Sequence, residues 1–212
     1  MSDKSQPTTA LLSSAYFPPI QWMQKLHRYG KVVVESHDNF VKQTYRNRCL
    51  IATANGIQSL TVPVERTEGG KCLMRDIRIS DHGSWRHLHW NALVSAYGES
   101  PFFMYYADDF RPFFERKWEF LFDFNMEITL KLCELLDVQP NIEVSSEYVA
   151  SDSCGDNIVD FRDVIRPKHP PLDIDFTARP YYQVHALRQG FQSNMSALDL
   201  LFNEGPEGIF YL

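Results

Sequence analysis

The chain has 212 residues, of which 44% are hydrophobic and 14% aromatic, which is enough to bury a core and too much for a disordered chain. Its 21 basic and 27 acidic residues give a net charge of −6, which argues against a general nucleic-acid or membrane-surface binder. The N-terminus lacks the apolar core of a secretory signal, and no stretch reaches the roughly 18 apolar residues of a membrane-spanning helix. The four cysteines form no Cys-x-x-Cys pair, so we expect them to be reduced. Together, these features predict a cytoplasmic protein without a membrane span.

The N-terminal region predicts a β-α-β unit. Residues 10–13 are a short apolar strand, residues 20–29 carry apolar side chains at helical spacing, and Gly30 ends the helix. Residues 31–35 follow as a second, β-branched strand that is apolar on both faces, as is typical of a buried parallel sheet. We therefore expect a flexible N-terminus over 1–9 and a single domain over 10–212.

The next section predicts antiparallel pairing. Residues 49–53 and 58–64 flank Asn55-Gly56, a strong hairpin signal because both turn positions need positive φ. Residues 67–71 predict a loop, and the alternation over 76–80 predicts another strand. With the β-α-β unit, this gives an α/β fold with a mixed sheet flanked by helices.

Helices dominate the following part of the chain. Ser84 could cap a helix over 85–97 with Trp85, Leu88, Ala92 and Ala96 on its buried stripe. An aromatic segment over 101–114 is expected to break at Pro112, and a long helix is expected over 117–136. Prolines favour an irregular, strand-poor segment from residue 141 onward, before a last helix that begins at Ser196.

Polar residues follow both strands of the β-α-β unit. Ser13, Ser14 and Tyr16 follow the first strand, and Glu35, Ser36, His37 and Asp38 follow the second. Because parallel strands end at the same edge of a sheet, where ligands bind, we expect these side chains to gather in one crevice. The alternative is that they only cap the helix and bind loop backbone.

One dense cationic run, Lys42 to Arg48, stands out in this acidic chain. Arginine forks suit a phosphate or carboxylate, and Tyr45 could stack on a base or sugar ring. If the run is extended, Arg46 and Arg48 share one face while Tyr45 and Asn47 share the other. The alternative is a solvated loop that pairs with surplus acidic residues.

Two histidines are candidate general bases. His89 lies one helical turn after Trp85 on the apolar side, and His37 follows the second strand. A lone buried histidine is more often a core residue than a base. His87 and His89 are two apart on a helix and form a poor metal chelate, so we assign no metal site. Asn125, on the apolar stripe of the long helix, predicts a buried structural amide.

The order of several motifs resembles the WbqC-like protein family. They are Tyr16-Phe17-Pro18, Lys42 through Asn47-Arg48, Leu60 to Val64, Trp85 with His89, Tyr97 to Phe103, and Ser196 to Asn203. The resemblance implies a bacterial protein of surface-polysaccharide (O-antigen) biosynthesis clusters, for which a glycyl or aminoacyl transferase role has been suggested. Many members carry His-Gln-Pro where this chain has Leu12-Ser13-Ser14, and two aspartates where it has Ser36-His37.

Two functional hypotheses follow. In the first, the protein transfers an acyl or aminoacyl group to a sugar-linked substrate: His89 or His37 is the base, Tyr16 with the Ser13 and Ser14 backbone stabilises an oxyanion, and the cationic run with Trp85 binds substrate. In the second, it is a non-catalytic module that binds a sugar nucleotide or a protein. In both, a small molecule such as a nucleotide sugar is the expected ligand. The sequence identifies neither a cofactor nor an oligomeric state, and no phosphate-loop or dinucleotide motif is present.

Overall fold

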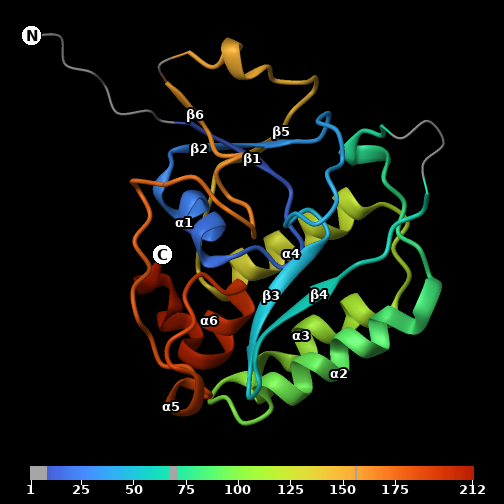
Figure 1. Cartoon of the computed structure of the whole chain (residues 1–212). Helices are drawn as coiled ribbons and strands as arrows, with labels where there is room; N and C mark the ends of the chain where they lie inside the picture. Colours follow the sequence, from blue (N-terminus) through green and yellow to red (C-terminus); the bar gives the residue numbers. More distant parts are fainter. Residues whose placement is uncertain (1–8, 67–70, 156) are drawn as a thin grey trace, which may run out of the picture.

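The computed structural model describes residues 9–66, 71–155 and 157–212 (Figure 1). Its main sheet has four parallel strands in the order β5-β2-β1-β6. In chain order the strands are β1 (Thr9–Ser13), β2 (Lys31–Glu35), β5 (Ile142–Val144) and β6 (Ile158–Asp160). A second sheet contains the antiparallel strands β3 (Arg48–Thr53) and β4 (Gly56–Thr61). The predicted α/β class is confirmed, with the parallel and antiparallel strands in two separate sheets. The expected flexible N-terminus lies, up to residue 8, outside the described residues.

The β-α-β unit is confirmed. Helix α1 (Ile20–Arg28) connects β1 to β2, which pair in parallel with Leu11 opposite Val33 and Ser13 opposite Glu35. The centre of β1 is at most 1% exposed, which explains why it shows no alternation between apolar and polar residues. The register places the carboxyl ends of both strands at the same edge of the sheet.

The described chain after residue 141 contains only two short strands, β5 and β6, neither of which the sequence predicted. Both strands have three residues and lie at the edges of the sheet, where β5 pairs with β2 and β6 pairs with β1. Each contains an acidic residue, Glu143 or Asp160, and neither contains a buried residue. Three residues that are half-buried or exposed carry no readable periodicity, so only their long-range pairing defines them as strands.

The hairpin is confirmed with a different turn. The two turn residues are Ala54 and Asn55, Thr53 pairs with Gly56, and only Gly56 has positive φ, at 105°. The strand expected over 76–80 is reduced to isolated bridges, Arg78 with Phe120 and Ile79 with Val64. The loop expected over 67–71 lies, up to residue 70, outside the described residues.

Three helices pack around an aromatic core: α2 (Trp85–Tyr97), α3 (Phe103–Glu115) and α4 (Leu121–Leu135). The predicted break at Pro112 is wrong, because α3 runs through this residue. Phe110, Phe113 and Phe114 hold the helix in the core. Pro112 has no N–H to donate to the Asp108 carbonyl, but Asp108 is exposed to solvent. Helix α4 begins four residues later than predicted, because Phe120 pairs with Arg78 and the Leu121 N–H donates to the Ile77 carbonyl.

The buried face of α2 also differs from the prediction. Leu88 is 60% exposed, whereas His89 and Leu93 are buried. Ser84 precedes α2 but its side chain does not cap the helix, and its φ of 50° is left-handed. The shorter helices α5 (Ala186–Gln189) and α6 (Ala197–Glu204) follow, and Ser196 caps α6 as predicted. None of the helices in the described residues combines the length and apolar character needed to cross a membrane.

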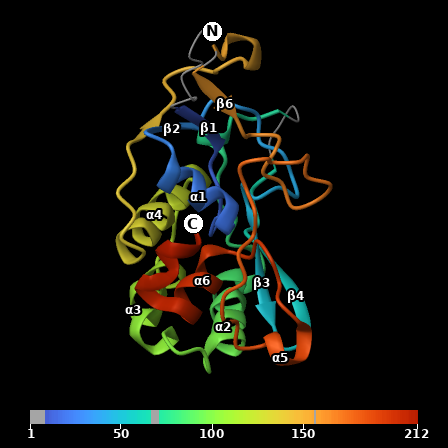
Figure 2. The same ribbon diagram turned by 90° about the vertical axis from the view of Figure 1, so that its left-hand side faces the viewer.

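Two views show where these parts lie. The parallel sheet occupies one end of the molecule, and α2, α3 and the β3–β4 hairpin occupy the other (Figures 1 and 2). Helix α4 lies between them. The carboxyl ends of the parallel strands therefore point toward the middle of the molecule, where loops from several parts of the chain meet.

Candidate functional site at the ends of the parallel strands

The strand order creates a switch point between β1 and β6. From β1 the chain passes to β2 on one side and later to β5 beyond it, whereas β6 lies on the other side of β1. Loops that leave the carboxyl ends of strands at such a point diverge and open a crevice, and ligands of open α/β sheets bind there. The missed strand β6 thus decides where the crevice lies.

A pocket of about 100 Å³ occupies this position. It has room for a small group such as a phosphate, a carboxylate or a short acyl chain. We call it the strand-end pocket. Its lining comes from three loops, and includes Ser13, Ser14 and Ala15 after β1, Val41, Thr44, Tyr45 and Arg46 from the cationic run, and Arg162, Asp163, Ile165 and Arg166 after β6, with Trp22 of α1.

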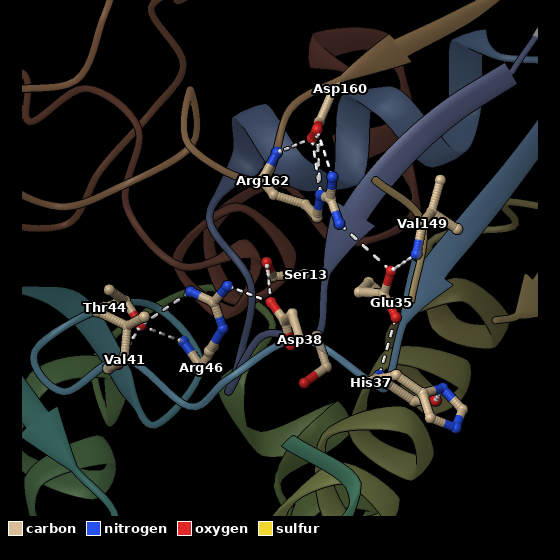
Figure 3. A network of polar contacts seen from close by, with 12 residues as sticks. Ser13, Glu35, His37, Asp38, Val41, Thr44, Arg46, Val149, Asp160 and Arg162 are labelled. Carbon is tan, nitrogen blue, oxygen red and sulfur yellow. Dashed lines mark hydrogen bonds and ion pairs between the residues drawn. The ribbon is translucent and has the colours of Figure 1, made fainter. Parts of the chain in front are cut away.

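Ser13 and Arg46 line the pocket, and Asp38, which does not itself line it, interacts with both of them. The Ser13 hydroxyl donates to Asp38 Oδ2 over 3.3 Å, and the Arg46 guanidinium forms an ion pair with the same oxygen (Figure 3). Arg46 and Asp38 are 7% and 6% exposed. The ion pair therefore joins the loop after β2 to the cationic run in a poorly solvated place, where electrostatic interactions are strong.

This ion pair keeps unused hydrogen-bonding capacity. Asp38 Oδ1 and Arg46 Nε are buried and have no hydrogen-bond partner among the described residues. Leaving a buried donor or acceptor unpaired costs about 1 to 3 kcal/mol each, more for charged groups, so native structures rarely tolerate it without a reason. A ligand that offers both a donor and an acceptor would satisfy the two atoms.

Glu35 holds the loops around the pocket together. It is fully buried, and its carboxylate accepts hydrogen bonds from Ser145 Oγ (2.6 Å), the His37 N–H (2.8 Å) and the Val149 N–H (2.8 Å), and one from Arg162 Nη1 (3.3 Å). The loops after β2, β5 and β6 therefore meet at one carboxylate (Figure 3). The missed strands β5 and β6 thus bring in three of the four partners of Glu35, namely Ser145, Val149 and Arg162.

Arg162 links Glu35 to the pocket. Its guanidinium also donates to Asp160 over 2.6 to 3.2 Å. Burial raises the pKa of Asp160, but the hydrogen bonds and charge of Arg162 outweigh it, and the net pKa is lowered. The guanidinium is therefore fixed between two carboxylates, and it forms a rigid wall of the strand-end pocket rather than a mobile arm.

His37 lies in a different hollow from the strand-end pocket. Arg75 Nη1 lies 2.9 Å from His37 Nε2 and must donate to it, because a guanidinium has no acceptor. His37 Nδ1 then donates to Ser36 Oγ over 2.9 Å, and that hydroxyl donates to the Ser145 carbonyl. The hollow has a volume of about 500 Å³ and is also lined by Phe120, Phe122 and Asp123. Successive residues after β2 therefore differ in their surroundings: His37 lines this hollow, whereas Asp38 contacts Ser13 and Arg46 of the strand-end pocket.

Tyr16, Trp85 and His89 lie in the aromatic core and do not line the strand-end pocket. The Tyr16 hydroxyl lies 2.9 Å from His89 Nδ1, and Tyr16 is 0% and His89 6% exposed. Burial lowers the pKa of His89 to about 4 although a hydrogen bond to the Thr61 backbone raises it, and burial raises the pKa of Tyr16 well above 10. His89 is therefore neutral at pH 7, donating to Thr61 and accepting from Tyr16.

The cationic run is divided among several environments. Residues 42–47 form turns rather than an extended strand, so Arg46 and Arg48 do not share a face. Arg46 and Tyr45 line the strand-end pocket, whereas Arg48 Nε donates to Thr61 Oγ1 within the hairpin. Asn47 is buried and donates to the Val62 carbonyl, and Lys42 is exposed. Asn125 is fully buried as predicted and donates to the Arg46 carbonyl over 2.8 Å.

The sequence placed Asp38 among the polar residues expected in the crevice but gave it no chemical role, and it did not point to Arg162 or Arg166. Asp38 stood among the polar residues after β2, and its place at the end of a strand was the available signal. Arg162 and Arg166 lie in a proline-rich region with no recognisable strand before them, so no sequence signal pointed to them. Within the described residues, no group of three or more histidine, cysteine or acidic side chains is arranged to hold a metal ion.

The model of the WbqC-like protein family matches residues 13–168, which include every residue that lines the strand-end pocket. This chain belongs to the WbqC-like protein family. It is also similar to an uncharacterized protein of Mycobacterium tuberculosis, Rv1507c, with 25% identity over 223 residues that cover 96% of each chain. No solved structure matches the chain. The family match includes Ser13 and Arg166, the first and last residues that line the pocket.

Proposed function

We propose that this WbqC-like protein is a group-transfer enzyme that holds a small acyl or aminoacyl group in the strand-end pocket. The supporting observation is that Ser13 and Arg46, which line a pocket of about 100 Å³, both contact Asp38, and that Asp38 Oδ1 and Arg46 Nε are buried with no hydrogen-bond partner among the described residues. A pocket of this size accommodates the transferred group, while the sugar-linked or nucleotide-linked remainder of the substrates lies outside it.

The proposed reaction uses these groups in defined roles. An amine or hydroxyl of the sugar-linked acceptor attacks the acyl carbon, a new C–N or C–O bond forms, and the bond between that carbon and its carrier breaks. Asp38 Oδ1 accepts the proton of the attacking group and returns it to the leaving group. The Arg46 Nε–H donates to the oxyanion that forms on the acyl oxygen, and Ser13 orients Asp38.

Asp38 is a better candidate base than the two histidines. His89 has both ring nitrogens engaged inside the core, and its lowered pKa makes it a weak base. His37 could serve only a substrate that enters its own hollow, because it lines that hollow and does not line the strand-end pocket. The roles of Tyr16 in an oxyanion site and of Lys42, Asn47, Arg48 and Trp85 in substrate binding gain no support from their positions.

Arg166 provides the test with the least risk to folding. It lines the pocket, is exposed and donates Nε to the His169 carbonyl. Thermal-shift measurements with amino acids, acyl-coenzyme A thioesters and nucleotide sugars should identify a ligand that raises the melting temperature. Arg166→Ala should weaken binding of that ligand about tenfold or more, because it removes a charge-assisted contact. Arg188→Ala, on the exposed surface of α5, should leave binding unchanged.

Mass spectrometry then separates enzyme from binding module. Incubation of the ligand with an amino sugar should yield an acylated sugar, and Asp38→Asn should abolish this product while ligand binding persists. Binding without product in the unmodified protein would favour the non-catalytic module, for which the absence of the family's His-Gln-Pro and aspartate pair is the supporting observation. If none of these compounds binds, the proposal is wrong.

A further inference from the structure

A third hollow lies between α2 and α3, at the opposite end of the molecule from the parallel sheet (Figures 1 and 2). We call it the α2–α3 hollow. It has a volume of about 340 Å³, which falls within the range of small-molecule sites. It is lined by Ser84, Arg86, His87 and Trp90 of the α2 region and by Arg111, Phe114 and Glu115 of α3.

Cationic groups form one part of this lining. Arg86 Nη1 donates to Asp81 over 2.6 Å, but Arg86 Nε and Nη2 are buried and have no hydrogen-bond partner among the described residues. Arg111 is exposed, and its Nε donates a hydrogen bond to Glu115 Oε1 over 2.7 Å. Its two terminal nitrogens can therefore donate to a ligand. The Arg86 guanidinium also lies over the Trp85 ring, 4.7 Å from its centroid. An anion that enters the hollow would therefore meet Arg111 first, and a small turn of the buried Arg86 guanidinium would add donors from the second helix.

Aromatic rings form the other part of the lining. Trp90 is half-buried and packs against Phe114 and Phe103, with ring centroids 5.7 Å and 6.3 Å away. Its indole is held in place by these contacts and still reaches the hollow. A flat ring can stack on such a surface, as bases stack on aromatic side chains in single-stranded nucleic-acid sites.

We propose that the α2–α3 hollow binds a nucleotide, with the base against Trp90 and Phe114 and the phosphate against Arg86 and Arg111. This site is separate from the strand-end pocket and does not depend on the reaction proposed there. Unpaired guanidinium donors beside an accessible indole fit a ligand that combines an anion with a ring, and the volume of the hollow suits a mononucleotide better than a longer polymer.

Isothermal titration with AMP, UMP, adenosine and inorganic phosphate separates the contributions of ring and anion. We expect saturable binding of AMP or UMP, and binding at least about tenfold weaker for adenosine and for phosphate, because each lacks half of the contacts. Arg86→Gln and Arg111→Gln should each weaken nucleotide binding about tenfold, and Trp90→Leu should weaken AMP more than phosphate.

Three controls make the test decisive. Arg188→Gln on α5 and Arg166→Ala in the strand-end pocket should leave AMP affinity unchanged. Circular dichroism and a melting curve for each variant establish that it folds. If Arg86→Gln does not fold because it loses the ion pair with Asp81, Arg111→Gln still tests the site, since it leaves that ion pair intact. Absence of nucleotide binding, equal affinity for phosphate and AMP, or affinity unchanged in folded Arg111→Gln would each overturn the proposal.

Discussion

The strand-end pocket and the aromatic core around His89 both contain buried polar groups, but they use them differently. In the core, Tyr16, His89 and the Thr61 carbonyl satisfy one another, and the ring nitrogens of His89 have no capacity left. At the strand ends, Asp38 Oδ1 and Arg46 Nε have no hydrogen-bond partner among the described residues, and Arg46 lines a pocket. A buried titratable side chain therefore indicates a site only where its hydrogen-bonding capacity is incomplete and a cavity adjoins it.

The largest effect is expected at Glu35, which organises the strand-end region. Glu35→Gln removes the charge that faces Arg162 and places an amide donor among groups that already donate. We expect the free energy of unfolding to fall by about 3 to 5 kcal/mol, as when one partner of a buried ion pair is removed. Urea denaturation measures this. Glu143→Gln, in an exposed ion pair with Lys31, should cost less than about 1 kcal/mol. Equal effects would show that Glu35 does not organise the site.

The core makes a pH-dependent contribution through His89. The unfolded chain protonates this histidine below its ordinary pKa of about 6.5, whereas the folded chain does so only near pH 4, so the unfolded state binds more protons between these values. Stability from this residue is therefore complete above about pH 6.5 and is lost as the pH falls toward 4, by about 3 kcal/mol. Urea denaturation at pH 7, 6 and 5 should show a steeper loss for the unmodified protein than for His89→Gln. Parallel pH curves would contradict the depressed pKa.

A smaller effect tests whether the Tyr16–His89 pair is structural. Tyr16→Phe leaves His89 Nδ1 buried without a donor and should lower the free energy of unfolding by about 1 to 3 kcal/mol. Tyr29→Phe removes only an exposed hydrogen bond to Asp175 and should cost less. Once a transfer assay exists, Tyr16→Phe should retain activity wherever it is folded. Loss of turnover in Tyr16→Phe at unchanged stability would indicate that the Tyr16–His89 pair takes part in catalysis.

The smallest effect separates the two arginines of the cationic run. Arg48→Ala removes a hydrogen bond to Thr61 and should cost about 1 kcal/mol or less, with affinity for the pocket ligand unchanged. Arg46→Ala should weaken that ligand strongly and also destabilise the fold, because it leaves Asp38 buried without its cation. Paired calorimetry and urea titrations measure both. A loss of affinity in Arg48→Ala would restore the view that the run binds as one surface.

The sequence by itself determined the β-α-β unit, the hairpin and most of the helices, because each leaves a local pattern of apolar spacing or turn residues. It also placed Ser13 and Asp38 at neighbouring strand ends, since parallel strands in one unit end at the same edge. It could not reveal β5 and β6, which have three residues each and are defined by pairing with strands more than 100 residues away.

Only the tertiary structure decided which polar residues share a pocket. The position of β6 beside β1 sets the switch point and brings Arg162 and Arg166 to Ser13, and the turns over 42–47 send Arg46 and Arg48 to different places. The residue type of His89 made it a candidate general base. In the structure, burial lowers its pKa, and its ring nitrogens are already engaged in hydrogen bonds. The local sequence determines which side chains a helix or strand carries. Long-range packing decides which of these side chains lie beside a cavity without a hydrogen-bond partner.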